Sequence, residues 1–153
     1  MLNVLRVPFE PQLHDGYCLP ACTSMIVSYL GKEISQQKIA RLLETSEIGT
    51  PLTRIRNLAK WGLHVHCAVE GSWQDLKQSI ASGNPVIVST YAEWLPYSEI
   101  QGQHVIVVVG ISASSAFVLD PATTGDILEI DKNALLAAWT EMDLAYVVIS
   151  LSK

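Results

Sequence analysis

The residues with the clearest chemical potential lie near the N-terminus, between positions 11 and 31. A polar, turn-prone segment leads to Cys18, and an apolar run with helical spacing follows and ends at Gly31. Pro20 is tolerated in a first helical turn, because its missing N–H would have no partner there. We therefore predict a helix over 19–30 with Cys18 at its mouth, where the helix dipole stabilises a thiolate and lowers the thiol pKa.

Gln12 strengthens the case for nucleophilic chemistry. It precedes Cys18 by six positions, across a loop that contains Gly16, so its carboxamide can fold back beside the sulfur. A carboxamide donor and the backbone N–H at a helix start together make an oxyanion hole. The pair indicates attack on a carbonyl carbon by Cys18, with Gln12 as a donor to the oxyanion.

A cysteine nucleophile needs a base, and the second half of the chain provides one. His104 begins the most apolar predicted strand, and Asp120 ends the next strand, directly before Pro121. Antiparallel neighbours joined by a short turn bring the start of one strand beside the end of the other. We therefore expect the His104 ring and the Asp120 carboxylate to be adjacent, as a base and its orienting group.

The elements that must position these residues are predicted as helices first and an antiparallel sheet afterwards. An extended arm covers 4–11, and two helical segments follow the cysteine helix, one capped by Ser35 and one running from Thr50-Pro51 to Gly62. Two further helices are predicted at 72–83 and 132–142. Strands are predicted at 63–69, 85–90 and 145–151, and three more follow at hairpin spacing from His104 onwards. This order is typical of an α+β fold.

Taken together, these motifs resemble the C39-type, papain-like cysteine peptidases, in which a Gln, a short gap and the nucleophilic Cys lead into an apolar helix. The residues that fall where that motif puts them are Gln12, Cys18, Ala21, Cys22, Met25, Ile26 and Gly31. The run from His104 and the later Asp-Pro also resemble the family's His and Asp motifs. The bacteriocin-processing branch usually has Asp before and Gly after the cysteine, where this chain has Tyr17 and Leu19.

The resemblance implies one α+β domain over 1–153, with an N-terminal helical part packed on a C-terminal antiparallel sheet and Cys18 in the cleft between them. It implies a triad of Cys18, His104 and Asp120, with Gln12 in the oxyanion hole and no cofactor. Family members often cleave leader peptides after a double glycine, at the front of transporters. Because this chain has no transporter segment, it is expected to act as a separate hydrolase of peptide or other amide bonds.

Each of these residues also has an ordinary structural explanation. A cysteine at a helix start is more often a packing residue, and Asp before Pro often only caps a turn. His14 is near enough to Cys18 to compete as the base, although Asp15 is its only candidate orienting carboxylate. The chemical interpretation is favoured because all four residues of the predicted site occur together and in order.

Three aromatic residues are candidates for contacts with a substrate. Tyr17 directly precedes Cys18, and Trp94 and Tyr97 lie in a polar, aromatic loop over 91–103. Side chains of this kind can also simply cover a core.

The other cysteines and histidines are interpreted as structural. Cys22 and Cys67 are predicted to be core residues. His64 and His66 share one side of a predicted strand and, with Cys67, would suggest a metal. No fourth ligand has a recognisable spacing, so we predict a solvated strand face and no metal.

Composition restricts the partners and the compartment. The 153 residues are 49% apolar and carry a net charge of −5, which disfavours nucleic acid and anionic membranes as partners. No segment is apolar enough for a membrane span, and the three cysteines cannot all pair within one chain. We therefore expect a cytoplasmic protein with a peptide or protein substrate, and the oligomeric state stays open.

Two other function classes remain open on the same fold. A catalytically degenerate module could bind a peptide without cutting it, and it would need no activated thiol. An acyl or peptidyl transferase could pass its acyl group to an amine instead of water. Reaction with a cysteine probe separates the first class from an enzyme, and product analysis with an added amine separates the second.

Overall fold

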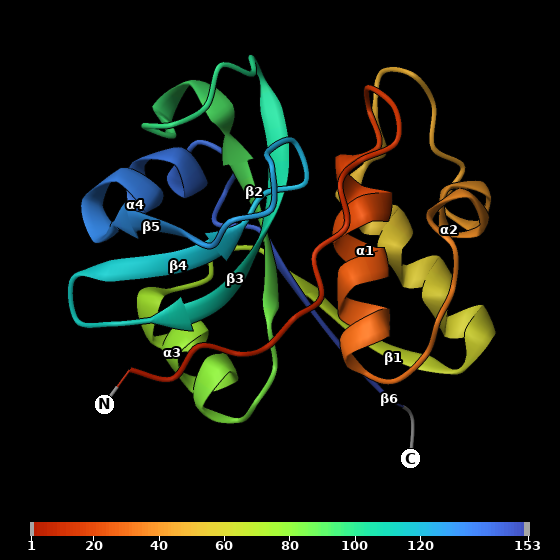
Figure 1. Cartoon of the computed structure of the whole chain (residues 1–153), viewed down its shortest axis with the longest axis horizontal. Coiled ribbons are helices and arrows are strands. Elements are labelled where there is room, and N and C mark those ends of the chain that lie inside the picture. The colour runs from red at the N-terminus through yellow and green to blue at the C-terminus, as the bar shows by residue number, and fades with distance from the viewer. Residues whose placement is uncertain (1, 152–153) are drawn as a thin grey trace.

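The computed structural model describes residues 2–151, which form two parts that lie side by side (Figure 1). The first part is helical and contains α1 (Cys18–Tyr29), α2 (Gln36–Leu42) and the 3-10 helix η1 (Leu52–Trp61). The second part is built on a six-stranded sheet. The predicted helical N-terminal part and C-terminal antiparallel sheet are therefore both present.

Every strand of the sheet is antiparallel to its neighbours. The order across the sheet is β1-β6-β2-β3-β4-β5. The strands are β1 (Leu63–Ala68), β2 (Val86–Tyr91), β3 (Gln103–Ile111), β4 (Ser115–Leu119), β5 (Leu128–Asp131) and β6 (Tyr146–Leu151). The later helices are α3 (Trp73–Ala81), the short 3-10 helix η2 (Ala92–Trp94) and α4 (Lys132–Thr140).

Strands β2 and β3 are the centre of the core because helices cover them from both sides. Figure 1 shows α1 on one side of these strands and α3 and α4 on the other. The side chains of 86–88 and 105–109 are at most 3% exposed. Strands that are buried on both faces have continuous apolar runs, as these two do. His104, at the start of β3, is thereby placed on the most firmly packed strand of the molecule.

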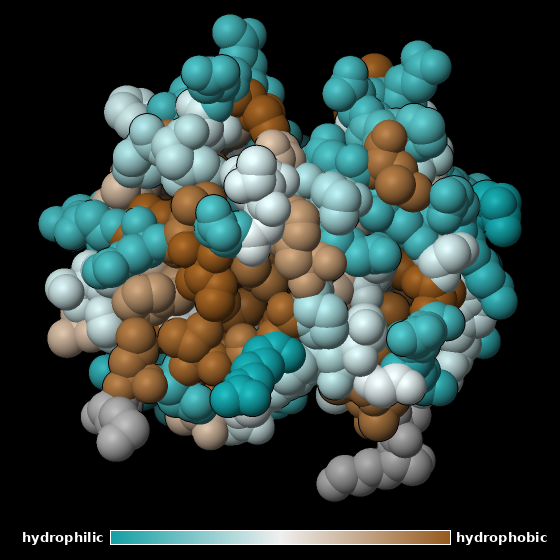
Figure 2. Space-filling view, in the orientation of Figure 1, coloured by the Kyte–Doolittle hydropathy of each residue, from teal (hydrophilic) through white to brown (hydrophobic). Residues whose placement is uncertain are grey.

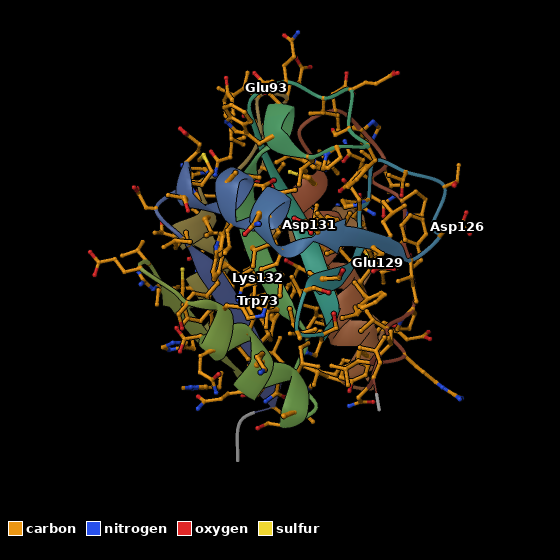
Figure 3. All side chains as sticks on the ribbon, turned by 90° about the vertical axis from the view of Figure 1, so that its left-hand side faces the viewer. Trp73, Glu93, Asp126, Glu129, Asp131 and Lys132 are labelled. Carbon is orange, nitrogen blue, oxygen red and sulfur yellow. The ribbon has the colours of Figure 1, made fainter. Side chains whose placement is uncertain are left out.

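Helices α3 and α4 are tied to each other behind the sheet. The Asp131 carboxylate accepts a hydrogen bond from the Asn133 N–H at 3.0 Å and caps the start of α4. The neighbouring Lys132 ammonium lies over the Trp73 ring of α3, 5.2 Å from its centroid (Figure 3). This cation–π contact joins the two helices at their N-terminal ends.

The N-terminal arm is extended, as predicted, and packs against β3. Val4 forms a β-bridge with Gly110, and the Leu5 N–H donates to the Val109 carbonyl oxygen at 2.8 Å. The β3–β4 register shifts between Val108 and Gly110, so a β-bulge leaves the Val109 carbonyl free for the arm. The arm is therefore held by the carbonyl group that the β-bulge leaves unpaired.

Two predicted helices differ in detail from the structure. The segment after Pro51 winds as a 3-10 helix rather than as an α-helix. The last helix ends at Thr140 rather than at position 142, because Asp143 and Leu144 adopt positive φ angles of 59° and 53°. Left-handed residues terminate a helix, and the Leu144 N–H then bonds back to the Trp139 carbonyl oxygen at 3.1 Å.

The surface is hollowed where the two parts meet. Figure 2 shows apolar side chains gathered on the left, over β3, β4 and the arm, and a dip at the top of the outline between the two parts. Two pockets lie in that region, and they contain Cys18 and Asp120 respectively. None of the described helices has the length and apolar character needed to cross a membrane.

Candidate active site

Cys18 is the first residue of α1, one residue before the predicted helix start. No side chain caps this helix, and its first internal bond runs from the Ala21 N–H to the Tyr17 carbonyl oxygen at 3.0 Å. A helix start without a side-chain cap leaves N–H groups and the positive end of the dipole available to a negative charge. The Cys18 thiol is therefore placed where a thiolate is stabilised.

His104 and Asp120 are adjacent, as the hairpin argument predicted. His104 is the second residue of β3, and Asp120 follows the last residue of β4. The His104 Nε2 and Asp120 Oδ1 atoms are 2.7 Å apart, and the two residues are only 2% and 1% exposed. Because Nε2 is engaged by Asp120, Nδ1 is the ring nitrogen left to interact with Cys18, which together with Asp120 raises the pKa of His104.

The pKa shifts of the three side chains favour an ion pair. Burial raises the pKa of the Cys18 thiol, but His104 and the backbone of Val105 and Leu19 together lower it by more, so the net shift is downward. Burial lowers the pKa of His104, yet Asp120 and Cys18 raise it to about 9. Burial also opposes ionisation of Asp120, whose pKa nevertheless lies below its usual value because His104 and Tyr97 bond to it. The pKa shifts therefore run toward the charged form of each side chain, a thiolate, an imidazolium and a carboxylate.

Helix α1 reaches β3 at a place where the sheet has a free edge. The last pair between β3 and β4 is Val107 with Leu119, so Val105 has no strand neighbour on that side. The Cys22 thiol donates to the Val105 carbonyl oxygen at 3.5 Å, and the Val105 backbone also lowers the pKa of the Cys18 thiol. At Val105 a cysteine of α1 thus takes the place of a neighbouring strand as the partner of β3.

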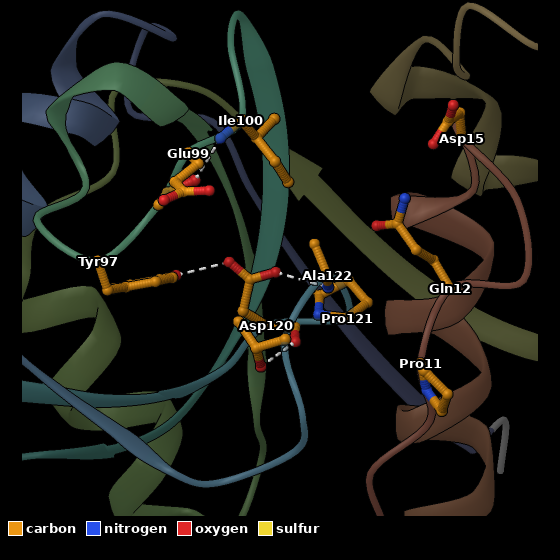
Figure 4. A pocket seen from close by; sticks show the side chains of 11 residues that line it. Pro11, Gln12, Asp15, Tyr97, Glu99, Ile100, Asp120, Pro121 and Ala122 are labelled. Carbon is orange, nitrogen blue, oxygen red and sulfur yellow. Dashed lines mark hydrogen bonds between the residues drawn. The ribbon is translucent and has the colours of Figure 1, made fainter.

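Gln12 lies on the opposite wall of the pocket that contains Asp120 (Figure 4). Its backbone N–H donates to the Pro121 carbonyl oxygen at 2.9 Å, and its side-chain Nε2 donates to the His14 carbonyl oxygen at 3.2 Å. An amide nitrogen carries two N–H donors, so a second donor remains for a ligand. The side-chain Oε1 of Gln12 is buried and has no partner among the described residues.

Two pockets lie beside Cys18 and Asp120. The first, of about 560 Å³, is hereafter the thiol pocket and is lined by Cys18, Leu19, Glu44, Ser46, Ile48, Gly49, Thr50, Pro51, Arg54, Gln103 and Val105. The second, of about 610 Å³, is the carboxylate pocket and is lined by Pro11, Gln12, Asp15, Tyr97, Ser98, Glu99, Ile100, Asp120, Pro121, Ala122 and Thr123. Cys18 therefore opens onto one pocket and Asp120 onto the other.

Tyr97 has a role that its sequence position did not reveal. It was predicted to contact substrate, and it does line the carboxylate pocket, but its hydroxyl donates to Asp120 Oδ2 at 2.6 Å (Figure 4). Burial and the negative charge of Asp120 raise the pKa of Tyr97, so the hydroxyl remains a donor. The sequence signal was only an aromatic residue in a polar loop, which does not indicate a specific partner.

The other two aromatic candidates differ in position. The Tyr17 ring packs edge-on against His14, with ring centroids 4.9 Å apart, and lines a third hollow beside Ser46 and Ile48. Trp94 is 54% exposed in η2 and is absent from the described linings of the thiol and carboxylate pockets. The structure therefore places Tyr17 near the thiol pocket and leaves Trp94 apart from it.

The remaining cysteines and histidines occupy ordinary positions. All three cysteines are unpaired, and Cys22 is fully buried in the core, as predicted. Cys67 is only half-buried and packs at the edge of the core. His64 and His66 are exposed on β1, where the His66 ring bonds to the Tyr146 hydroxyl at 3.2 Å.

Comparison with known proteins shows the family to which the chain belongs. The model of the peptidase C39-like family matches residues 4–146, a stretch that includes every predicted site residue. The chain belongs to the peptidase C39-like family. Among curated protein sequences, none matches the chain significantly.

Solved structures of peptidases share the fold at low sequence identity. A protein described as a C39-like peptidase from Bacillus anthracis has a TM-score of 0.81 and 18% identity, with all of both chains covered. A double glycine motif protease from an AMS/PCAT transporter, in complex with its leader peptide, has a TM-score of 0.65 and 17% identity over 97% of this chain and 92% of its own. The Carica candamarcensis cysteine protease CMS1MS2 has a TM-score of 0.68 and 16% identity over 95% and 93%. The predicted papain-like α+β fold is confirmed.

Proposed function

We propose that this C39-like protein is a cysteine peptidase that cleaves a peptide or other amide bond through an acyl-enzyme on Cys18. The observation that carries the proposal is the buried His104–Asp120 pair, together with Cys18 at the start of an uncapped helix and the lowering of its pKa by His104. A nucleophile, a base and an orienting carboxylate are the three groups that acyl transfer requires.

The proposed reaction begins with attack of the Cys18 thiolate on the substrate carbonyl carbon. The carbonyl π electrons move onto oxygen, and the Cys18 N–H and the Gln12 amide stabilise that oxyanion. The intermediate then collapses, the C–N bond breaks, and imidazolium of His104 protonates the leaving amine. His104, now neutral, takes a proton from water, which attacks the thioester and releases the acid and the thiolate.

The pH dependence of Cys18 alkylation tests the proposed pairing of Cys18 with His104 directly. Iodoacetamide should label Cys18 rapidly well below pH 8 in the intact chain, and the advantage should disappear in His104→Ala. His64→Ala is the matched control, because His64 is exposed on β1. Mass spectrometry separates the label on Cys18 from that on Cys22 and Cys67, whose pKa values burial raises. Labelling of Cys18 that rises only near an ordinary thiol pKa in all three proteins would support a binding module instead.

Leader peptides are the substrate class that we propose for this activity. The supporting observation is that a relative with the same fold, a double glycine motif protease, forms a complex with its leader peptide. Synthetic peptides that differ only in Gly-Gly or Ala-Ala before the scissile bond test this class, with cleavage expected after Gly-Gly alone. Equal cleavage of both peptides, or none of either while another amide is hydrolysed, would remove leader peptides from the proposal. An added amine appearing in the product would identify a transferase.

We place this activity in one domain that works in a reducing compartment such as the cytoplasm. A thiolate nucleophile must stay reduced, and none of the three cysteines is paired. A single cooperative transition in urea denaturation tests the one-domain statement, and activity with and without a thiol reductant tests the compartment. Activity that is retained under oxidising conditions, in which cysteines form disulfides, would argue against a reducing compartment.

A further inference from the structure

A buried glutamine outside the predicted site binds the segment that carries Gln12. Gln36 is the first residue of α2 and is only 3% exposed. Its Nε2 donates to the Pro11 carbonyl oxygen at 3.0 Å, and its Oε1 accepts from the Leu13 N–H at 2.9 Å. Both groups of one side-chain amide are therefore used on the residues that flank Gln12.

These contacts make the Gln12 segment equivalent to a central β-strand. In an extended chain, the carbonyl of one residue and the N–H two positions later point to the same side, and the N–H between them points to the other. Gln36 binds the first side, through Pro11 and Leu13. Pro121 binds the second side, through the Gln12 N–H at 2.9 Å. The backbone at Gln12 is thus fixed between α2 and the residue that follows Asp120.

The position of Gln36 within α2 argues for this binding role. The helix buries Ile39, Ala40 and Leu43, and Gln36 stands three, four and seven residues before them, on the same face. A leucine would fill that position with apolar contacts. A buried amide is favourable there only because both of its polar groups are bonded, and its loss would leave the Pro11 carbonyl and the Leu13 N–H unpaired.

We infer that Gln36 is a positioning residue for the oxyanion donor Gln12. The role rests on the proposed function, because an oxyanion donor matters only if Cys18 attacks a carbonyl. The Gln12 side chain has one hydrogen bond of its own, to the His14 carbonyl oxygen, and an unpartnered Oε1. The place of its amide is therefore set by the backbone that Gln36 and Pro121 hold.

Replacement of Gln36 should affect the chemical step without affecting the thiolate. In Gln36→Leu, kcat should fall by about tenfold or more, since loss of one oxyanion donor costs about 100-fold to 1000-fold and misplacement costs a part of it. KM should change by less than about twofold, and Cys18 alkylation should be unchanged. Gln37→Leu, on the exposed face of the same turn, is the matched control and should match the unmodified chain.

A double-mutant cycle distinguishes positioning from a general structural role. If Gln36 acts through Gln12, Gln36→Leu should have almost no further effect on kcat in a Gln12→Ala background. Independent, multiplicative losses would overturn the inference, as would a loss of Cys18 alkylation in Gln36→Leu.

A charge variant keeps the test available if Gln36→Leu does not fold. In Gln36→Glu the ionised carboxylate accepts from the Leu13 N–H but cannot donate to the Pro11 carbonyl, whereas the protonated acid does both. The kcat of Gln36→Glu relative to the unmodified chain should therefore rise as the pH is lowered from 8 to 5. A ratio that stays constant with pH would contradict the bonding described.

Amide hydrogen exchange separates failure of this role from failure of the proposed function. Gln36→Leu should speed exchange at Leu13, and at Gln12 by a smaller factor, whether or not any substrate is turned over. If the intact chain hydrolyses no peptide, the proposed function fails, and unchanged exchange at Leu13 would separately show that Gln36 holds nothing in place.

Discussion

At the scale of single residues, Asp120 is the most completely bonded group in the site. Its Oδ1 lies 2.7 Å from His104 Nε2 and accepts a hydrogen bond from the Ala122 N–H at 2.9 Å. Its Oδ2 accepts a hydrogen bond from the Tyr97 hydroxyl at 2.6 Å. A buried carboxylate with donors on both oxygens stays ionised and cannot rotate freely. Asp120 can therefore orient the imidazole and stabilise its charge, as the proposed reaction requires.

Tyr97→Phe should weaken both the fold and the catalysis, because it removes one donor from Asp120 and leaves Oδ2 unpaired in a buried site. We expect a loss of about 2 kcal/mol in the free energy of unfolding and a drop in kcat/KM of about threefold to tenfold. Urea denaturation and steady-state kinetics measure the two effects.

The control for Tyr97→Phe is Tyr29→Phe. The Tyr29 hydroxyl donates to the Gly83 carbonyl oxygen at 2.8 Å, so this variant also removes one partly buried hydrogen bond. It should lose stability without a change in kcat/KM. Equal losses of activity in the two variants would show that Tyr97 acts only through stability.

The shifted pKa values predict a bell-shaped pH dependence of kcat/KM. Activity should rise as Cys18, whose pKa is lowered, loses its proton, and it should fall as His104 loses its proton near pH 9. Asp120→Asn removes the negative charge that raises the pKa of His104, so the alkaline limb should move to lower pH. Rate profiles between pH 5 and 10 measure this shift, and an alkaline limb that stays in place in Asp120→Asn would contradict the assignment.

At the scale of elements, the contact between α1 and the free edge of β3 brings the helix that carries Cys18 against the strand that carries His104. Cys22 is the packing residue of this contact, fully buried against Val105. Its small side chain lets the helix approach the backbone of the strand closely. Helix α1 therefore packs on the backbone of β3 as well as on the apolar core.

A larger side chain at position 22 should slow the alkylation of Cys18, whereas a smaller one should not. Cys22→Ala leaves a small cavity and should cost about 1 kcal/mol of stability while leaving Cys18 alkylation intact. Cys22→Leu overfills the contact and should push α1 away from β3, which slows alkylation at neutral pH. The rate of iodoacetamide labelling measures the effect, and equal rates in both variants would show that this spacing does not matter.

The loop before α1 depends on Gly16, which has a φ of +81°. A Cβ atom there would lie 2.8 Å from the Ser46 carbonyl oxygen and 2.6 Å from that of Glu47. Gly16→Ala should therefore displace the loop and reduce activity, in addition to about 1 kcal/mol of backbone strain. Gly31→Ala is the matched control, because its φ is +90° and nothing lies within 4 Å of the added atom. Thermal denaturation and kcat/KM for both variants separate strain from displacement.

The sequence was sufficient for features that depend on neighbours in the chain. Apolar spacing predicted the helix at Cys18, and hairpin spacing predicted that His104 meets Asp120. The contacts of Tyr97 and Gln36 were missed, because they depend on how loops and helices from distant parts of the chain come together. The winding of 52–61 as a 3-10 helix was missed as well, since its apolar spacing is equally compatible with an α-helix.

At the scale of the whole molecule, the site exists only where the two parts meet. Cys18 and Gln12 come from the helical part and its lead-in, and His104 and Asp120 come from the sheet. The bonds that join the parts at the site are few and run through Val105 and Pro121. The arrangement of Cys18, His104 and Asp120 is therefore a property of packing between the parts rather than of either one.

The contact at the free edge of β3 also affects when the surroundings of Cys18 are complete during synthesis. Cys22 and its partner Val105 are separated by 83 residues, and the Gln12 segment waits for Pro121, which is translated later still. Both contacts involve residues of the part built on the sheet, so neither can form while only the helical part has been translated. In the proposed peptidase, position 18 would therefore hold an ordinary cysteine until the sheet has been made, and the nucleophile would be activated only when the two parts pack together.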